Sequence, residues 1–175
     1  MSDKKKKRRG SRAYLEDFHR SASGEYVYTG AVWSRRAGME RRRQLLMLWV
    51  PGVLMIAAAV VRGCIPAAGM LNCAYVLLPY VGELVCAVSV VWALVRFSAN
   101  EEPLRDYVYN ATAAILPVRA VFTACFAAAA LIGEIVYFAI NGFAGVPLVI
   151  LHAVCGICAL LVCKVSRAQE WEKSE

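Results

Sequence analysis

Apolar residues fall into four long blocks, separated by short segments that are polar or contain glycine and proline. The second block, about residues 71–95, carries Glu83 as its single charged side chain. As a helix it would reach roughly 37 Å, which exceeds the roughly 30 Å hydrocarbon core of a bilayer. Three further spans are expected at about 45–61, 115–140 and 143–163. The pattern therefore predicts an all-α integral membrane protein with four antiparallel transmembrane helices.

The charged residues outside these blocks are distributed very unevenly. Thirteen of the 20 Lys and Arg residues lie in the first 43 positions, and residues 1–12 are a low-complexity basic run typical of disorder. We expect residues 1–44 to form a basic, partly disordered N-terminal tail, and residues 164–175 a short charged tail, on either side of the bundle at 45–163. With four spans, only Arg62 lies on the side opposite both termini. The positive-inside rule then predicts a cell-membrane protein with both termini in the cytoplasm.

Composition changes this picture little. The chain has 175 residues, of which 59% are hydrophobic, and a formal net charge of +7; its mean hydropathy is +0.51. Because the positive charge belongs to the tail, it indicates contact with anionic lipid head groups, and nucleic-acid binding is not expected. Between the second and third blocks, residues 96–114 are polar and predict a short surface helix.

One short pattern occurs twice outside the apolar blocks. An acid is followed by Tyr-Val-Tyr and a small polar residue, first at Tyr26 and Tyr28 and again at Tyr107 and Tyr109. The first copy lies in a β-prone run bounded by Gly24 and Gly30. One interpretation is that both copies are aromatic anchors at the membrane interface. The other is that they are cytoplasmic docking strips for a protein partner.

Three ionisable residues lie within the expected spans: Glu83, Glu134 and His152. Such residues are costly in a bilayer and are therefore candidates for function. Counting along the helices places them as a staggered polar column in the outer half of the membrane. In one interpretation the carboxyl groups are neutral and hydrogen-bond across the bundle, which holds the helices in register. In the other, the column titrates and supports a small proton- or cation-coupled transporter.

Cysteines offer a third candidate chemistry. Cys155 and Cys158 form a C-x-x-C on the fourth span, and Cys64 and Cys73 flank the outer loop. A four-span bundle with these features is similar to the quinone-linked membrane thiol oxidoreductases, and the resemblance implies thiolate exchange with a disulfide. The C-x-x-C begins near mid-membrane, however, where a thiolate is disfavoured. A disulfide between Cys64 and Cys73 is the alternative expectation if the outer side is oxidising.

No hydrolase, nucleotide-binding or metal-binding pattern occurs in the sequence, so no cofactor, metal or catalytic residue is expected. The favoured hypothesis is a non-enzymatic multi-pass membrane protein that serves as an accessory or interaction subunit. The coupled transporter is the first alternative and the thiol-disulfide oxidoreductase the second. Expected partners are the lipid bilayer, a cytoplasmic protein and a second copy of the chain.

Overall fold

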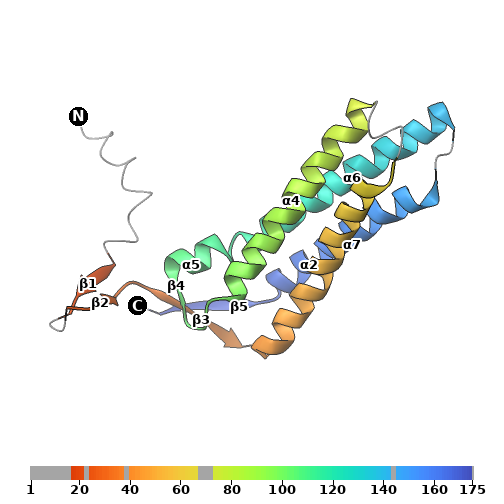
Figure 1. The fold of residues 1–175 in the computed structure, drawn as a ribbon. Coiled ribbons are helices and arrows are strands. Elements are labelled where there is room, and N and C mark those ends of the chain that lie inside the picture. Colours follow the sequence, from red (N-terminus) through yellow and green to blue (C-terminus); the bar gives the residue numbers. More distant parts are fainter. Residues whose placement is uncertain (1–16, 22–23, 38–39, 67–72, 143–144, 175) are drawn as a thin grey trace, which may run out of the picture.

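The structure is a computed structural model that describes residues 17–21, 24–37, 40–66, 73–142 and 145–174 (Figure 1). It is mostly helical. Within the described ranges, four helices are long and apolar enough to cross a membrane, as the sequence predicts. They are α2 (Arg41–Cys64), α4 (Ala74–Ser98), α6 (Leu116–Asn141) and α7 (Val146–Arg167). Each overlaps one expected block, and the helix bounds differ from the expected ones by at most four residues.

The four long helices pack in a ring. Helix α2 contacts α4 and α7, and α6 contacts the same two helices from the other side. The centre is filled largely by small side chains that are almost completely buried, such as Ala87, Ala127 and Ala159, with Met55 and Val90 between them. Small residues let the helix backbones approach closely, which is the mode of packing that favours helix association where water exclusion does not drive it.

Strands close one end of the helical bundle. β3 (Val32–Ala37), β4 (Leu104–Arg105) and β5 (Glu170–Ser174) form an antiparallel sheet in the order β4-β3-β5. Val32 pairs with Arg105 on one side and with Ser174 on the other. Figure 1 shows this sheet at one end of the helices, next to the short helix α5 (Asp106–Ala111). We call the sheet and α5 the cap.

The cap differs from the expectation for the two ends of the chain. The sequence predicts tails at residues 1–44 and 164–175. In the structure, however, β3 from the first segment pairs with β5 from the second. The third partner, β4, comes from the segment 96–114, where the expected short helix also occurs as α5. Strand pairing between segments that are about 140 residues apart leaves no local signal in the sequence, because each strand is too short for a clear alternation of polar and apolar residues.

A separate hairpin precedes the cap. It consists of β1 (Phe18–Arg20) and β2 (Tyr26–Tyr28), paired antiparallel. This confirms the β-prone run between Gly24 and Gly30. The expected disorder of residues 1–12 falls outside the described residues. Figure 1 shows the hairpin beyond the cap, away from the long helices.

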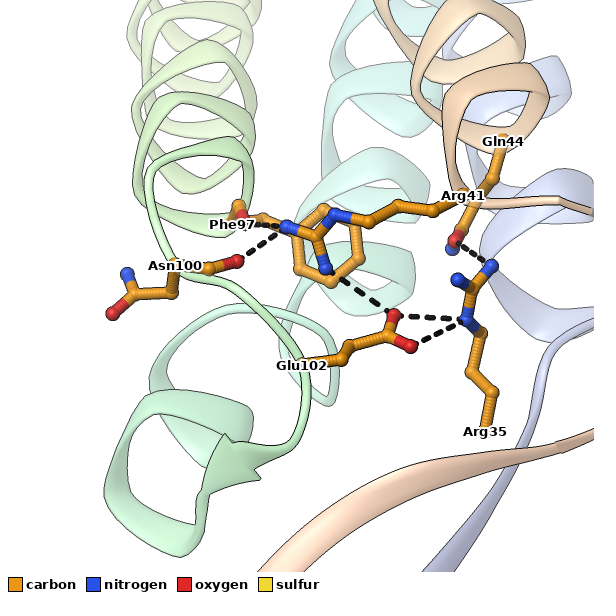
Figure 2. Close-up of polar contacts among 6 residues, drawn as sticks. All are labelled: Arg35, Arg41, Gln44, Phe97, Asn100 and Glu102. Carbon is orange, nitrogen blue, oxygen red and sulfur yellow. Dashed lines mark hydrogen bonds and ion pairs between the residues drawn. The ribbon is translucent and has the colours of Figure 1, made fainter.

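The cap is joined to the helices by charged and aromatic contacts. Figure 2 shows Glu102 between two guanidinium groups: the Nε atom of Arg35 lies 2.8 Å from its Oε1 atom, and Nη1 of Arg41 lies 3.3 Å from the same oxygen. Arg41 also donates to the backbone carbonyls of Phe97 and Asn100 and stacks on the Phe97 ring. The start of α2 is therefore tied to the end of α4.

An aromatic cluster lies inside the cap. Trp33 of β3 stacks on Tyr109 of α5 with ring centroids 4.1 Å apart, and its indole N–H donates to Asp106 at 2.8 Å. Trp171 of β5 packs edge-on against both Tyr109 and Phe97. Aromatic packing of this kind adds stabilisation beyond the area that it buries. Residues from both ends of the chain and from the middle thus share one small core.

Candidate functional site

Four ionisable residues, one from each long helix, are almost completely buried in the bundle. Glu83 of α4, Glu134 of α6 and His152 of α7 are the three predicted candidates, and Arg62 of α2 is the fourth; all are at most 1% exposed. Burying a charged or polar group is unfavourable unless it is paired or hydrogen-bonded. The first question is therefore which partners these side chains have.

Glu83 and His152 contact each other directly. The Oε2 atom of Glu83 lies 2.6 Å from Nδ1 of His152. Two of the three residues of the predicted column are thus brought together, by helices that are not neighbours in the sequence. The short separation requires a proton between the two atoms, carried either by the imidazole or by the carboxyl group.

Glu134 is not part of that pair. Its Oε2 atom accepts a hydrogen bond from Nη2 of Arg62 at 2.9 Å. The sequence pattern does not reveal Arg62, because this residue directly follows the first apolar block and resembles a loop residue. Helix α2 continues to Cys64, so Arg62 is still on the helix and its side chain lies inside the bundle. An arginine one residue beyond an apolar block, opposite a buried acid, is the signal that would have indicated this pair.

Tyr80 of α4 lies between the two pairs. Its hydroxyl donates to the backbone carbonyl of Ala59 on α2 at 3.0 Å, and the guanidinium of Arg62 lies 5.8 Å from its ring centroid. On its other side, the ring packs edge-on against His152, with centroids 6.3 Å apart. The two hydrogen-bonded pairs, Arg62–Glu134 and Glu83–His152, are therefore linked by ring contacts of Tyr80, and we call these five side chains from all four helices the polar network. Tyr80 was not identified from the sequence.

Glycines beside the two acids allow the helices to approach. A Cβ atom added at Gly133 would lie 2.6 Å from the backbone carbonyl oxygen of Tyr75 on α4, which is closer than real Cβ contacts. A Cβ at Gly82 would overlap the ring of Phe126 on α6. Each glycine thus places its neighbouring acid, Glu134 or Glu83, at a close α4–α6 contact. The sequence thus repeats a Gly-Glu pair, Gly82-Glu83 and Gly133-Glu134, and in both pairs the glycine leaves room for the neighbouring helix.

Substituting Gly133 by Ala is expected to force α4 and α6 apart, because the obstacle is a backbone atom that cannot rotate away. Overpacking of this kind typically lowers the free energy of unfolding by about 1–3 kcal/mol. Gly156→Ala is the matched control, because its Cβ would meet Ala127 at an ordinary 3.5 Å. Thermal unfolding in detergent checks this prediction. Equal melting temperatures for the two variants would contradict the close approach at Gly133.

The four tyrosines of the predicted docking strips differ in their surroundings. Tyr28 and Tyr107 meet edge-on with centroids 6.2 Å apart, so the two copies of the repeat contact each other. Tyr28 also donates its hydroxyl to the carbonyl of Ala31, and burial raises the pKa of its phenol. Tyr109 stacks on Trp33 inside the cap. Only Tyr26 of the four extends outward, at 73% exposure.

The cysteines are all free thiols in the structure, including Cys64 and Cys73, so their disulfide stays a prediction. Cys155 and Cys158 are both buried in the bundle. Thiol-disulfide exchange by this pair stays a prediction, and it would require these two buried thiols to become accessible.

Arg119, at the start of α6, also has an internal partner. Its Nη1 atom donates to the backbone carbonyl of Ser89 on α4 at 2.7 Å. The contact adds a polar link between α4 and α6 to the two close approaches at the glycines.

Comparison of the chain with protein-family models, with curated protein sequences and with solved structures finds no match.

Proposed function

We propose that the protein is a multi-pass membrane protein whose four long helices cross the bilayer antiparallel. The outer surface of the bundle supports this. It carries many large apolar side chains that are more than half exposed, among them Leu78, Val85, Ile132 and Ile140. The exposure of so many large apolar side chains on the long helices is unfavourable in water and is matched by lipid chains.

Both termini are placed on the cytoplasmic side in this proposal. The pairing of β3 with β5 supports a common side, because these strands immediately precede the first long helix and follow the last one. The charge distribution supports the cytoplasm, since nineteen of the 20 Lys and Arg residues lie on that side. Arg62, the remaining one, has its charge compensated by Glu134.

The proposed activity is that of an accessory or interaction subunit, with the β1–β2 hairpin as the docking element for a cytoplasmic protein. The observation that carries this proposal is the contrast among the tyrosines. Tyr28, Tyr107 and Tyr109 have partners within the fold, whereas Tyr26 and the adjacent Val27 are 73% and 49% exposed on a hairpin that extends beyond the cap. Exposed aromatic residues of this kind are enriched at protein interfaces.

The polar network supports a structural role within this proposal. Each acid has a basic partner on another helix, so the network fixes which helix faces which. We infer a role in helix pairing, because an intact buried pair adds little net stability, whereas an arrangement that separates the two partners is strongly unfavourable. Proton or cation coupling through Glu83, Glu134 and His152 stays a prediction. Binding of anionic lipid head groups by the basic tail and formation of a homo-oligomer stay predictions as well.

Site-specific photo-crosslinking in intact cells tests the docking element. A photoreactive amino acid at Tyr26 is expected to give discrete adducts with a cytoplasmic protein. The matched control is the same amino acid at Leu78, which is 68% exposed on a long helix and would face lipid. Adducts should disappear from the Tyr26 probe when Val27 is replaced by Asp. The proposal fails if the Tyr26 probe gives no protein adduct, or gives the same adducts as the Leu78 probe.

A further inference from the structure

A groove lies between α6 and α7 on the outside of the bundle. It has a volume of about 260 Å³ and is lined mainly by small residues, including Ala124, Ala128, Ala153 and Gly156. Among its lining residues, His152 alone carries a polar side chain. The groove thus places the apolar outer surface next to His152, which holds Glu83.

His152 reaches this groove with half of its hydrogen-bonding capacity unused. Its Nδ1 atom is occupied by Glu83, whereas Nε2 is buried and has no hydrogen-bond partner among the described residues. A buried polar atom without a partner costs about 1–3 kcal/mol. Water normally fills this role, but the groove is otherwise apolar, and a water molecule needs two to four polar neighbours to be stable there. A suitable partner for Nε2 is therefore a polar atom that belongs to an otherwise apolar molecule.

The Glu83 contact decides which polar group fits. If the carboxylate accepts a hydrogen bond from Nδ1–H of a neutral ring, Nε2 is an acceptor; if the ring is protonated, or if the carboxyl group donates to Nδ1, Nε2–H is a donor. A carbonyl oxygen would satisfy only the second arrangement. A hydroxyl group satisfies both, because it donates and accepts. A neutral ligand is also required, since a charged group would have to enter an apolar groove without a counter-ion.

We propose that the α6–α7 groove binds a neutral lipid that bears a hydroxyl group, with the hydroxyl bonded to Nε2 of His152 and the apolar body in the groove. This inference rests on the membrane placement proposed above. It does not depend on the docking role of the hairpin. Two classes of neutral lipid carry such a hydroxyl, the sterols and the diacylglycerols. The groove is open on its outer side, so the rest of either molecule would remain among the lipid chains.

The chain offers a direct spectroscopic test, because it contains only two histidines. The full chain is labelled with ¹⁵N-histidine and placed in lipid nanodiscs, so that His152 is observed with His19 as the internal reference. Cholesterol or dioleoylglycerol is then added, and cholestane, which has no oxygen, is the control probe. A shift of the His152 Nε2 resonance by a hydroxyl lipid, with His19 unchanged and no shift with cholestane, supports the site. The lipid that causes the shift identifies the class.

Two neighbouring alanines provide matched variants. Ala128 lines the groove, whereas the adjacent Ala129 is exposed and does not line it. Ala128→Leu fills the groove without entering the core, and it is expected to weaken binding at least about tenfold through loss of the hydrogen bond and the apolar contacts. Ala129→Leu should bind as the wild type does.

Three results would overturn the inference. The first is no His152 shift with either hydroxyl lipid. The second is an equal shift with cholestane, and the third is equal binding by the Ala128→Leu and Ala129→Leu variants. In each case incorporation into nanodiscs and crosslinking at Tyr26 would be unaffected. Absence of lipid binding in the groove is therefore distinguishable from failure of the proposed function.

Discussion

Replacing Arg62 by Met is expected to destabilise the bundle by about 3–5 kcal/mol, because the change leaves a buried carboxylate without its counter-ion. Glu134 is 0% exposed, and its Oε2 atom lies 2.9 Å from the guanidinium of Arg62. Methionine is unbranched and apolar and keeps much of the volume of the arginine side chain, so the main effect is the loss of the charge. Reversible unfolding in detergent micelles, monitored by circular dichroism, gives the free energy of unfolding.

Two further variants make this prediction specific. Removing both partners, in Arg62→Met with Glu134→Met, is expected to restore most of the lost stability, because no unpaired charge is then left inside. Arg43→Met is the surface control on the same helix: Arg43 is exposed, and the change should stay within about 0.5 kcal/mol. A double variant as unstable as Arg62→Met alone would show that the volume of Arg62, and not its charge, is what the bundle requires.

The second large effect is expected at Phe97, where the cap and the helices meet. Phe97 is 1% exposed; it contacts the guanidinium of Arg41 on one side and the ring of Trp171 on the other. Phe97→Ala removes this shared contact and leaves a cavity, which typically costs about 3–5 kcal/mol. Because Trp171 lies on β5, the C-terminal strand should separate from β3 before the helices unfold.

Limited proteolysis distinguishes this order of events from general unfolding. In Phe97→Ala we expect rapid cleavage after Lys173 or Arg167, around β5, while the long helices keep their circular dichroism signal. Phe122→Ala is the matched control, because Phe122 is 56% exposed on α6 and is not one of the buried core residues. If both variants are cleaved at the same rate, Phe97 does not hold the cap to the bundle.

The long helices and their approximate limits could be predicted from the sequence because the signal is local. Uninterrupted apolar residues of sufficient length predict a membrane-spanning helix whatever else the chain contains. Glu83, Glu134 and His152 could be identified in the same way, since an ionisable residue within such a block is conspicuous. Their partners could not, because pairing depends on which helices are neighbours and on how each is rotated about its axis.

Arg62 and Tyr80 illustrate what the local pattern leaves out. Arg62 follows an apolar block and looks like a loop residue, yet one more helical turn places its side chain opposite Glu134. Tyr80 resembles any aromatic residue in a span, and only the ring-shaped packing places it between the two ion pairs.

The sequence by itself determined that the chain forms four long apolar helices with a strongly basic end, because hydrophobicity and charge are properties of each segment alone. Only the tertiary structure decided that the two ends of the chain pair as strands, that the two Tyr-Val-Tyr copies meet, and that each buried acid has its own basic partner. These outcomes depend on contacts between segments distant in the sequence, and such contacts are set by the packing of the whole bundle.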